Sequence, residues 1–529
     1  MNSLRRFARK DLLLPFLSGT LLALSFPKFN QALLAWLAPG LILLVTDDAS
    51  SKRILLNGFA AGLGNYLVSL IWMLASPLPV KALPGYVIVC AIQSGYVALW
   101  CLACWKLFPR PSVAAGEPAA NLVAQFSGLK FRQRITWPFV CAASWVAMEM
   151  CMARCFIGFP WNLLGASQYH RLPLIQIASL TGVYGVSFLL AWMSVSLLVV
   201  IALLRGGLKN IGRAMLQLAV PGIACLCVLY YGSGRLNTSD AGRLTLRMAL
   251  VQPAFSYRPA DDIATESTRL RELVGTAVKS MPDLIVVPEW AGAGQSDVLT
   301  IASLTGTQRT WAVVGSHENL LPFEGKAIFF NGAFLIDPNS ERLANPTATY
   351  PERHAVLFED FLSVNRSAQS KNAGVFQIEK PRVRFSPMVA YEDIFPQEVR
   401  SRSDASIDFL LHVGSEARIG ESAAQWQHAA NAVFRAVENG LPLVRCANKG
   451  LSCWIDSCGR IHNAYFDNSI NVYQAGCKII EVPLYLAKPG HPSTFYNRHG
   501  DWFGWACVGL LGLAIVVRVV RERRNRKPA

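Results

Sequence analysis

The chain has 529 residues, of which 52% are hydrophobic and 16% are charged, a balance that indicates a membrane protein rather than a large soluble one. A formal net charge of +16 would suit a nucleic-acid-binding protein, but the basic residues gather at both ends and in short loops between apolar runs. No glycine-rich phosphate loop or zinc-type Cys and His spacing accompanies them. We therefore expect no nucleic-acid partner, no metal and no other cofactor.

Eight apolar runs approach or exceed the length that crosses a bilayer, which is about 20 helical residues. They cover 11–26, 30–46, 54–76, 84–107, 137–156, 172–204, 213–232 and 502–520. The first two are borderline and could form a tight hairpin, and the sixth is long enough to begin as an interfacial stretch. Residues 25–28 offer no small-residue cleavage site, so we expect the first run to stay in the protein.

The distribution of Lys and Arg predicts an orientation, because loops rich in these residues stay in the cytoplasm. Basic residues cluster before the first run and at 52–53, 106–134, 205–213 and 521–527. Seven spans in 1–232 would then deliver the polar segment 243–490 to the outer face, and an eighth would return the chain to a basic tail. We expect a multi-pass protein of a bacterial inner membrane with its large domain on the periplasmic side.

Segment 243–490 changes character, because short apolar runs alternate with turn residues and helical stretches. The runs are 244–251, 283–287, 311–314, 329–336, 384–389, 409–413, 441–445 and 479–482. Helical patterns cover 264–281 and 423–439. This alternation predicts an α/β layer structure with functional residues at the carboxyl ends of its strands.

Three motifs in this segment place polar residues where predicted strands end. They are Pro288 and Glu289 after the run 283–287, then Tyr350, Glu352 and His354 in one stretch, and Ala390, Tyr391 and Glu392 after the run 384–389. A single acid at a strand end is more often a solvated or capping carboxylate. The order and spacing of all three motifs carry more information than any one of them.

Together these motifs resemble the apolipoprotein N-acyltransferase family of the nitrilase, or carbon-nitrogen hydrolase, superfamily. Further matching stretches span nearly the whole chain, at 158–168, 179–188, 425–428, 435–438, 442–445, 448–450 and 500–502. The resemblance implies a nitrilase-like αββα sandwich outside the membrane and an all-α bundle of about eight transmembrane helices. The expected domains are the bundle at 1–232, the sandwich at 243–490, the last helix at 502–520 and the basic tail at 521–529.

The resemblance also implies roles for individual residues. Glu289 takes the position of the general base, Glu352 that of the catalytic Lys, and Ala390 that of the Cys that carries an acyl chain as a thioester. Further acidic positions near the site fall on Glu392 and Glu438. Substrate-binding positions fall on Trp161, Tyr350, His354, Tyr391, Arg418 and Trp426. Structural alternatives remain open, since Trp426 and His428 could serve packing and capping, Glu438 could pair with an Arg, and Trp161 could belong to an interfacial aromatic belt.

In the family reaction a phospholipid donates its acyl chain to the enzyme Cys, which passes it to the N-terminal Cys amine of a lipoprotein. The methyl group of Ala390 cannot attack an ester. Glu352 places negative charge where an oxyanion must develop, and loss of one oxyanion donor already costs about 3 kcal/mol. The turn that covers the family's acyl pocket with Trp and Phe here has Arg418 and Ile419.

We therefore interpret the chain as a monomeric relative that binds phospholipid and a lipoprotein N-terminus without acylating it. It would serve as a scaffold or as an accessory of an envelope machine, of which conjugation systems are one example. An alternative is an active N-acyltransferase with a displaced nucleophile, for which Cys446 is the nearest candidate. Amide hydrolysis of the nitrilase kind and a purely structural membrane module are further alternatives. Four thiols, Cys446, Cys453, Cys458 and Cys477, fall in segment 243–490, and their pairing stays open.

Overall fold

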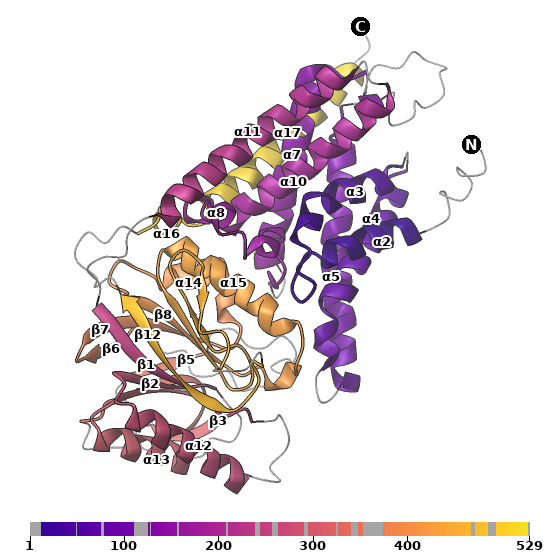
Figure 1. The fold of residues 1–529 in the computed structure, drawn as a ribbon. Coiled ribbons are helices and arrows are strands. Elements are labelled where there is room, and N and C mark those ends of the chain that lie inside the picture. Colours follow the sequence, from indigo (N-terminus) through magenta and orange to yellow (C-terminus); the bar gives the residue numbers. More distant parts are fainter. Residues whose placement is uncertain are drawn as a thin grey trace. The chain divides into compact units, whose positions relative to one another are not determined.

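The computed structural model of the chain forms two compact units (Figure 1). The first is helical and consists of Met1–Met73, Val80–Gly234 and Asp501–Ala529, and the second consists of Leu74–Pro79 and Arg235–Gly500. The residues that the structure describes are 12–48, 50–75, 79–109, 125–126, 128–155, 158–207, 210–237, 244–255, 263–289, 295–323, 326–339, 348–352, 374–466, 471–484 and 493–526.

Helices of very different length build the first unit. They are α2 (Leu13–Ala23), α3 (Ala38–Thr46), α4 (Ser51–Ser69), α5 (Pro79–Lys106), α7 (Phe131–Arg154), α8 (Leu172–Ile175), α9 (Ala178–Thr181), α10 (Val183–Arg205), α11 (Ile211–Leu236) and α17 (Trp502–Arg526). Within the described residues, α5, α7, α10, α11 and α17 are long and apolar enough to cross a membrane.

The shorter helices correspond to the apolar runs that the sequence marked as borderline. The first two runs form α2 and α3, with 11 and 9 residues. At 1.5 Å per residue they extend for about 17 Å and about 14 Å, whereas the hydrocarbon core is about 30 Å thick. The run 172–204 begins as the one-turn helices α8 and α9 and continues as α10 after Gly182, whose φ is +69°.

Small residues let helices of this unit approach closely. A Cβ added to Gly64 of α4 would lie 1.9 Å from the carbonyl oxygen of Phe16 in α2, so any side chain at Gly64 would push the two helices apart. Close backbone contact through small residues is the usual way in which membrane helices pack, because lipid provides no hydrophobic driving force between them.

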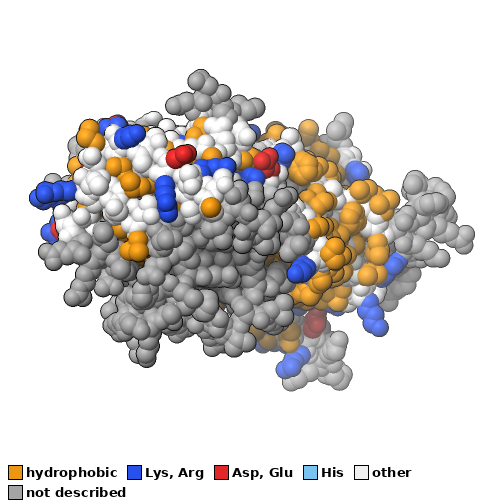
Figure 2. All heavy atoms as spheres, turned by 90° about the horizontal axis from the view of Figure 1, so that it is seen from below, with side chains coloured by type: hydrophobic (Ala, Val, Ile, Leu, Met, Phe, Trp, Pro, Cys, Tyr) orange, Lys and Arg blue, Asp and Glu red, His pale blue; other side chains and the backbone are white. Residues whose placement is uncertain are grey.

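Large apolar side chains remain exposed on the long helices. Examples are Val80, Val87 and Ile88 on α5, Leu226 and Tyr230 on α11, and Leu513 and Val516 on α17. Figure 2 shows one face of the molecule, on part of which apolar side chains form a nearly continuous surface with a few Lys and Arg side chains beside it. Apolar surface of this extent is typical of contact with lipid or another protein.

The second unit contains two six-stranded sheets. The first has the order β12-β1-β2-β3-β4-β5, and the second has the order β11-β10-β9-β8-β7-β6. The strands are β1 (Leu244–Gln252), β2 (Leu284–Val287), β3 (Trp311–Phe323), β4 (Lys326–Ile336), β5 (Ala348–Pro351), β6 (Phe376–Glu379), β7 (Arg382–Val389), β8 (Phe409–Gly414), β9 (Leu443–Ala447), β10 (Cys453–Ile455), β11 (Ile461–His462) and β12 (Gly476–Leu484). All eight apolar runs predicted in segment 243–490 are strands.

Parallel strands lie at the centre of each sheet and antiparallel strands lie outside them. The parallel trios are β1, β2 and β3 in the first sheet and β7, β8 and β9 in the second. Because parallel strands end at the same edge, residues that follow them in the sequence are brought together. This arrangement places the motifs after β2 and β7 at strand carboxyl ends, as the sequence predicted.

Alternating side chains of the central strands fill two different cores. In β2, Leu284 and Val286 point into the core between the sheets, whereas Ile285 and Val287 point into the core beneath helices α12 (Ile263–Lys279) and α13 (Gln295–Thr307). A strand that is buried on both faces must be apolar at every position, which explains the unbroken hydrophobic runs.

Helices cover the outer faces of both sheets in an αββα sandwich (Figure 1). Helices α12 and α13 lie against the first sheet, and α14 (Pro396–Ser401) and α15 (Ala424–Asn439) lie on the side of the second. Helix α15 ends at Gly440, whose φ of +68° is the left-handed conformation that glycine adopts easily at a helix end. The nitrilase-like fold that the resemblance implied is confirmed.

Candidate functional site

A strained turn holds Ala390 at the carboxyl end of β7. Its φ is +51°, in the left-handed region that residues with a Cβ seldom occupy. The backbone N–H of Ala390 donates to the carbonyl oxygen of Val413 in β8 at 3.2 Å, which ties the turn to the neighbouring strand. A short 3-10 helix, Glu392–Ile394, follows at once. Strain of this kind persists where the surroundings fix the backbone, and it is frequent at functional sites.

The fully buried carboxylate of Glu392 holds this turn in place through hydrogen bonds. Oε2 accepts a hydrogen bond from the backbone N–H of Val389 at 3.1 Å and one from the Tyr350 hydroxyl at 2.7 Å. The same oxygen lies 2.9 Å from Nη1 of Arg402, which also contacts the Tyr350 hydroxyl. Both Glu392 and Tyr350 thus hold the turn in place, and Tyr350 links it to β5.

Three acidic residues act on the Tyr391 hydroxyl, and two of them, Glu289 and Glu352, are predicted site positions. Burial raises the pKa of its hydroxyl, and the negative charges of Glu416, Glu289 and Glu352 raise it further. Glu289 follows β2, Glu352 follows β5 and Tyr391 follows β7. The structure therefore brings together the three motifs that the sequence singled out.

Glu289 lies just after β2, where the neighbouring strand β3 passes close to the backbone. A Cβ added to Gly315 of β3 would lie 2.5 Å from the backbone nitrogen of Glu289, so β3 passes directly against the residue that follows Pro288. The Glu289 side chain is buried. A carboxylate at this place is oriented by the sheet and not by a loose loop.

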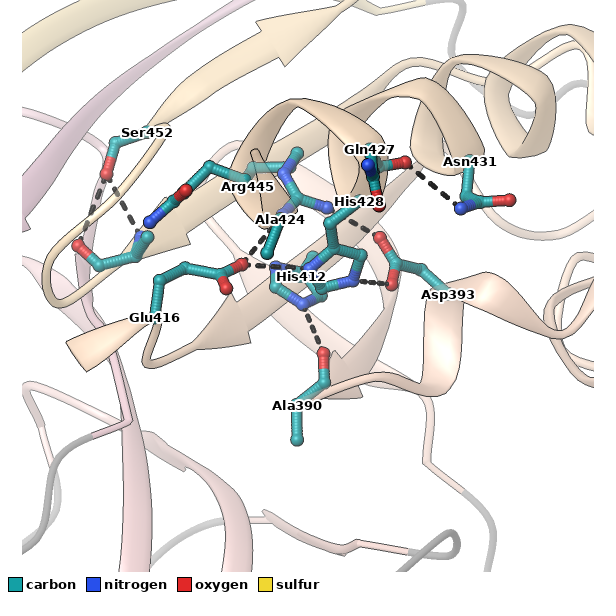
Figure 3. Close-up of polar contacts among 12 residues, drawn as sticks. Ala390, Asp393, His412, Glu416, Ala424, Gln427, His428, Asn431, Arg445 and Ser452 are labelled. Atoms are coloured by element: carbon teal, nitrogen blue, oxygen red, sulfur yellow. Dashed lines mark hydrogen bonds and ion pairs between the residues drawn. The ribbon is translucent and has the colours of Figure 1, made fainter. Parts of the chain in front are cut away.

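Behind the turn lies a buried network of charged residues from β9, α15 and the loops after β7 and β8 (Figure 3). Arg445 Nη1 lies 2.6 Å from Oδ2 of Asp393, and Arg445 Nη2 lies 3.5 Å from Oε1 of Glu416. His428 is held between the two acids, since Nδ1 lies 2.8 Å from Glu416 Oε1 and Nε2 contacts Asp393 Oδ1. Each of these four residues is almost completely buried.

His412 of β8 connects this network to Ala390. Its Nε2 lies 2.6 Å from the carbonyl oxygen of Ala390, and because a carbonyl can only accept, Nε2 carries the proton and donates. The rings of His412 and His428 meet edge to face with centroids 5.0 Å apart. Figure 3 shows the Ala390 carbonyl directed toward His412 and its methyl group directed away from the network.

The charges within the network set its protonation. Burial alone would raise the pKa of Asp393, but the positive charges of His428 and Arg445 hold it below its ordinary value. Burial tends to lower the pKa of His428, but Asp393 and Glu416 raise it above its usual range. Burial, assisted by Arg445, lowers the pKa of His412 to about 3, so this ring is neutral. The site can thus hold a positive charge at His428 between two carboxylates.

The thiol nearest in the sequence to the nucleophile motif lies inside the core. Cys446 of β9 is fully buried, and its Sγ donates to the carbonyl oxygens of Val251 and Val286 at 3.3 Å and 3.4 Å. Burial raises its pKa well above the ordinary value, so the thiolate is strongly disfavoured. Reactive cysteines have the opposite surroundings, with partial exposure and positive charge nearby.

The other predicted site residues lie elsewhere in the described structure or outside it. Trp426 packs on Tyr465 with ring centroids 6.3 Å apart, and Glu438 pairs with Arg435 through a 2.7 Å contact. Trp161 belongs to the helical unit, where it is buried against Trp72 and Phe159. His354 and the side chain of Arg418 fall outside the described residues.

Two members of the network, Asp393 and His412, were not among the residues that the sequence singled out. The sequence contains a sign of both residues. Asp393 directly follows the motif at 390–392, and His412 is the polar residue in an otherwise apolar strand. Of the other three, His428 and Arg445 lie in matching stretches and Glu416 lies in the turn that departs from the family, and none of them was predicted as a site residue. An acid and a base far apart in sequence cannot be paired without the fold.

Comparison with known protein families matches two different models to two separate parts of the chain. Residues 18–196 match the family model described as "Apolipoprotein N-acyltransferase N-terminal domain". Residues 247–480 match the model described as "Carbon-nitrogen hydrolase". The two matches together cover most of the chain.

Individual relatives match over nearly the full length. An apolipoprotein N-acyltransferase of Geobacter metallireducens is 31% identical over 98% of this chain and 96% of its own length. One from Rickettsia typhi is 25% identical over 84% of this chain and 86% of its own. Among solved structures, an amidase of the nitrilase superfamily from Nesterenkonia aligns with a TM-score of 0.36 and 16% identity, covering 45% of this chain and 90% of the amidase.

Proposed function

Because the chain belongs to the apolipoprotein N-acyltransferase family, we propose that it binds that family's reactants without forming an acyl-enzyme. The reactants would be a membrane phospholipid and the N-terminus of a lipoprotein. The protein would act as a lipid and lipoprotein scaffold, for instance as an accessory of an envelope machine such as a conjugation system. We further propose that it is a monomer and binds no nucleic acid.

The observation that carries this proposal is the side chain at the strained turn. The backbone at residue 390 has the geometry that presents a nucleophile at a strand end, yet the side chain is a methyl group. A thioester needs a sulfur atom whose proton a nearby base can take. Ala390 offers none, so the turn supports binding but not covalent transfer.

A second change at the same site acts in the same direction. The position that resembles the family's Lys holds Glu352, whose charge acts on the Tyr391 hydroxyl together with Glu289 and Glu416. Acyl transfer passes through a tetrahedral intermediate with a negative oxygen. A carboxylate at the position of the family's Lys would destabilise that oxygen, whereas a catalytic site places hydrogen-bond donors or cations there.

Binding of a lipid chain is supported by a cavity within the helical unit. It has a volume of about 440 Å³, within the range of about 300–1,000 Å³ that is usual for small-molecule sites. Apolar residues line it, among them Phe139, Phe188, Trp192, Val228 and Leu510. An acyl chain suits such a lining because its burial requires no hydrogen-bond partners.

The alternative of a displaced nucleophile receives no support from Cys446. Its thiol donates to two backbone carbonyls within the core between the sheets, and burial disfavours its thiolate. To attack a lipid ester it would have to leave the core. A Cys446→Ser variant should therefore behave as the wild type does in the assay below.

The decisive assay is the N-terminal mass of a model lipoprotein in cells depleted of their own N-acyltransferase. Cells that make the wild-type chain should accumulate diacylated lipoprotein, whereas cells that make an active family member should yield the triacylated form. Membrane levels of both proteins are compared by immunoblotting. Triacylated product from the wild-type chain would contradict the proposal.

The converse experiment restores the missing groups. Ala390→Cys combined with Glu352→Lys should recover measurable triacylation and a hydroxylamine-sensitive lipid on residue 390. Ala390→Cys alone should be about 10²- to 10³-fold less active, the usual effect of lacking one oxyanion donor. Equal activities of the single and double variants would show that Glu352 is not near the reacting oxygen.

A further inference from the structure

Three side chains behind the Ala390 turn direct donor atoms toward one another. One donor atom each from Asp393, His412 and His428 lies within 4.8 Å of the others, and all three residues are buried. They come from the loop after β7, from β8 and from α15, so the fold and not local sequence brings them together. Two imidazoles and one carboxylate form a ligand set that divalent transition metals prefer.

The remaining polar atoms of these residues are occupied as those of metal ligands usually are. His428 donates Nδ1–H to Glu416 Oε1 at 2.8 Å, and His412 donates Nε2–H to the carbonyl of Ala390 at 2.6 Å. Oδ2 of Asp393 lies 2.6 Å from Nη1 of Arg445. Ligating imidazoles almost always donate their second N–H to a carboxylate or carbonyl, and ligating carboxylates are themselves hydrogen-bonded.

One nitrogen atom of these three side chains has no hydrogen-bond partner among the described residues. Once Nε2 of His412 donates to Ala390, Nδ1 is the ring atom with a lone pair, and it has no hydrogen-bond partner among the described residues. A network of ion pairs without a metal would explain why His428 contacts Asp393, but it would not explain the Nδ1 atom of His412. It leaves a buried nitrogen acceptor unused, which is unfavourable unless something binds there.

The electrostatic surroundings also suit a cation. Glu416 lies directly beside the cluster, and Glu289 and Glu352 act with it on the nearby Tyr391 hydroxyl. Arg445 is the positive group in contact with Asp393 and Glu416. A divalent ion would replace the proton that His428 Nε2 holds against Asp393, which leaves two neutral imidazoles and one carboxylate as ligands. Its charge would be partly balanced by these acids.

We propose that Asp393, His412 and His428 bind one divalent transition-metal ion of the Zn²⁺ type behind the Ala390 turn. Three protein ligands leave one position of a tetrahedral site for water or another small ligand. The ion would join the turn after β7 to β8 and α15 and so fix the backbone at residue 390. This inference is independent of the proposed lack of acyl transfer.

The test is metal binding by the full-length protein, purified in detergent with a tag that contains no His and stripped with a chelator. Wild type should take up one Zn²⁺ per chain in competition with a chromophoric chelator. Co²⁺ in place of Zn²⁺ should give the intense visible absorption of a tetrahedral site. Uptake without a defined stoichiometry, or absorption typical of hydrated Co²⁺, would overturn the proposal without recourse to any variant.

Variants then assign the ligands. His412→Gln should abolish the Co²⁺ absorption and the competitive Zn²⁺ uptake, because it removes the nitrogen that an ionic network does not use. Glu416→Gln, which keeps the three ligands, should weaken binding by about 10- to 100-fold. His462→Gln is the matched control, since this His stacks on Trp454 in the same unit and outside the cluster.

Thermal unfolding of each metal-free protein shows whether the variants are folded. Zn²⁺ should raise the midpoint of the wild type and of His462→Gln but not that of His412→Gln, since a ligand stabilises only the state that binds it. If His412→Gln binds Zn²⁺ as tightly as the wild type does, the assignment is wrong.

Discussion

At the scale of single residues, Ala390 occupies a backbone conformation that residues with a Cβ seldom adopt, and its neighbours hold it there. A left-handed φ costs about 1–2 kcal/mol for a residue with a Cβ. Three hydrogen bonds hold that conformation here. The N–H of Ala390 donates to the carbonyl oxygen of Val413, and the Ala390 carbonyl oxygen accepts from His412. The buried carboxylate of Glu392 accepts from the backbone N–H of the preceding residue, Val389. These contacts do not depend on what residue 390 carries, so a methyl group is tolerated.

The same contacts yield a prediction about stability. Glu392→Gln should lower the free energy of unfolding of the second unit by about 3–5 kcal/mol, because it removes the buried carboxylate that pairs with the buried Arg402. The measurement is denaturant or thermal unfolding followed by Trp fluorescence.

The chain offers a matched control for that substitution. Glu398 pairs with the same Arg402 at 3.4 Å, but its side chain is 34% exposed, whereas that of Glu392 is 0% exposed. Glu398→Gln should therefore change stability by about 0–1 kcal/mol. Comparable losses in both variants would mean that burial does not decide the strength of the Glu392 pair.

At the scale of elements, strand ends and helix contacts decide what the chain can do. The carboxyl ends of β2 and β7 present Glu289 and Ala390, and β8 adds His412 from its interior. Helix α15 contributes His428 to the same network. Parallel strands end at the same edge of a sheet, which is why residues from separate motifs lie at one edge here.

Helix packing in the first unit gives a second prediction. Gly64→Ala should lower the midpoint of thermal unfolding, at a cost of about 1–3 kcal/mol, because its Cβ would lie 1.9 Å from the Phe16 carbonyl. Gly95→Ala in α5 is the control, since no atom lies within 4 Å of the added Cβ. That change should be neutral or stabilise by up to about 1 kcal/mol, because Ala favours helices. Equal effects at both positions would argue against close packing of α2 and α4.

At the scale of the whole molecule, charge predicts how the chain crosses the membrane. The second unit connects to the end of α11 and to the start of α17, and α17 is long enough to cross once. The residues at the end of α17 and beyond it include Arg521, Arg523, Arg524 and Lys527. Basic segments stay in the cytoplasm, so the second unit should lie on the opposite, periplasmic side.

This topology can be tested with epitopes in the full-length protein. An epitope at the turn 337–339 should react with antibody on intact spheroplasts, whereas one after residue 529 should react only after permeabilisation. A fluorescent protein that folds only in the cytoplasm should be bright when fused to the tail. Reversed labelling would place the second unit in the cytoplasm.

The sequence alone determined the family, the fold class and the strands of the second unit. The eight apolar runs are strands, and those at the centre of the sheets, such as β2 and β8, are apolar nearly throughout because both of their faces are buried. The sequence predicted Glu289, Glu352 and Ala390 as site positions, and in the structure each of them follows a strand closely. The sequence also predicted that the first two apolar runs are of borderline length for a membrane span, and the helices they form, α2 and α3, are short.

Only the tertiary structure decided which side chains meet. The contacts of His428 with Asp393 and Glu416, the unused Nδ1 of His412 and the burial of Cys446 all join residues from different elements. Sequence periodicity reports the face that a residue occupies within its own strand or helix. It does not report the partner across the interface, because that depends on how sheets and helices pack, and so the network behind Ala390 could be read from the fold alone.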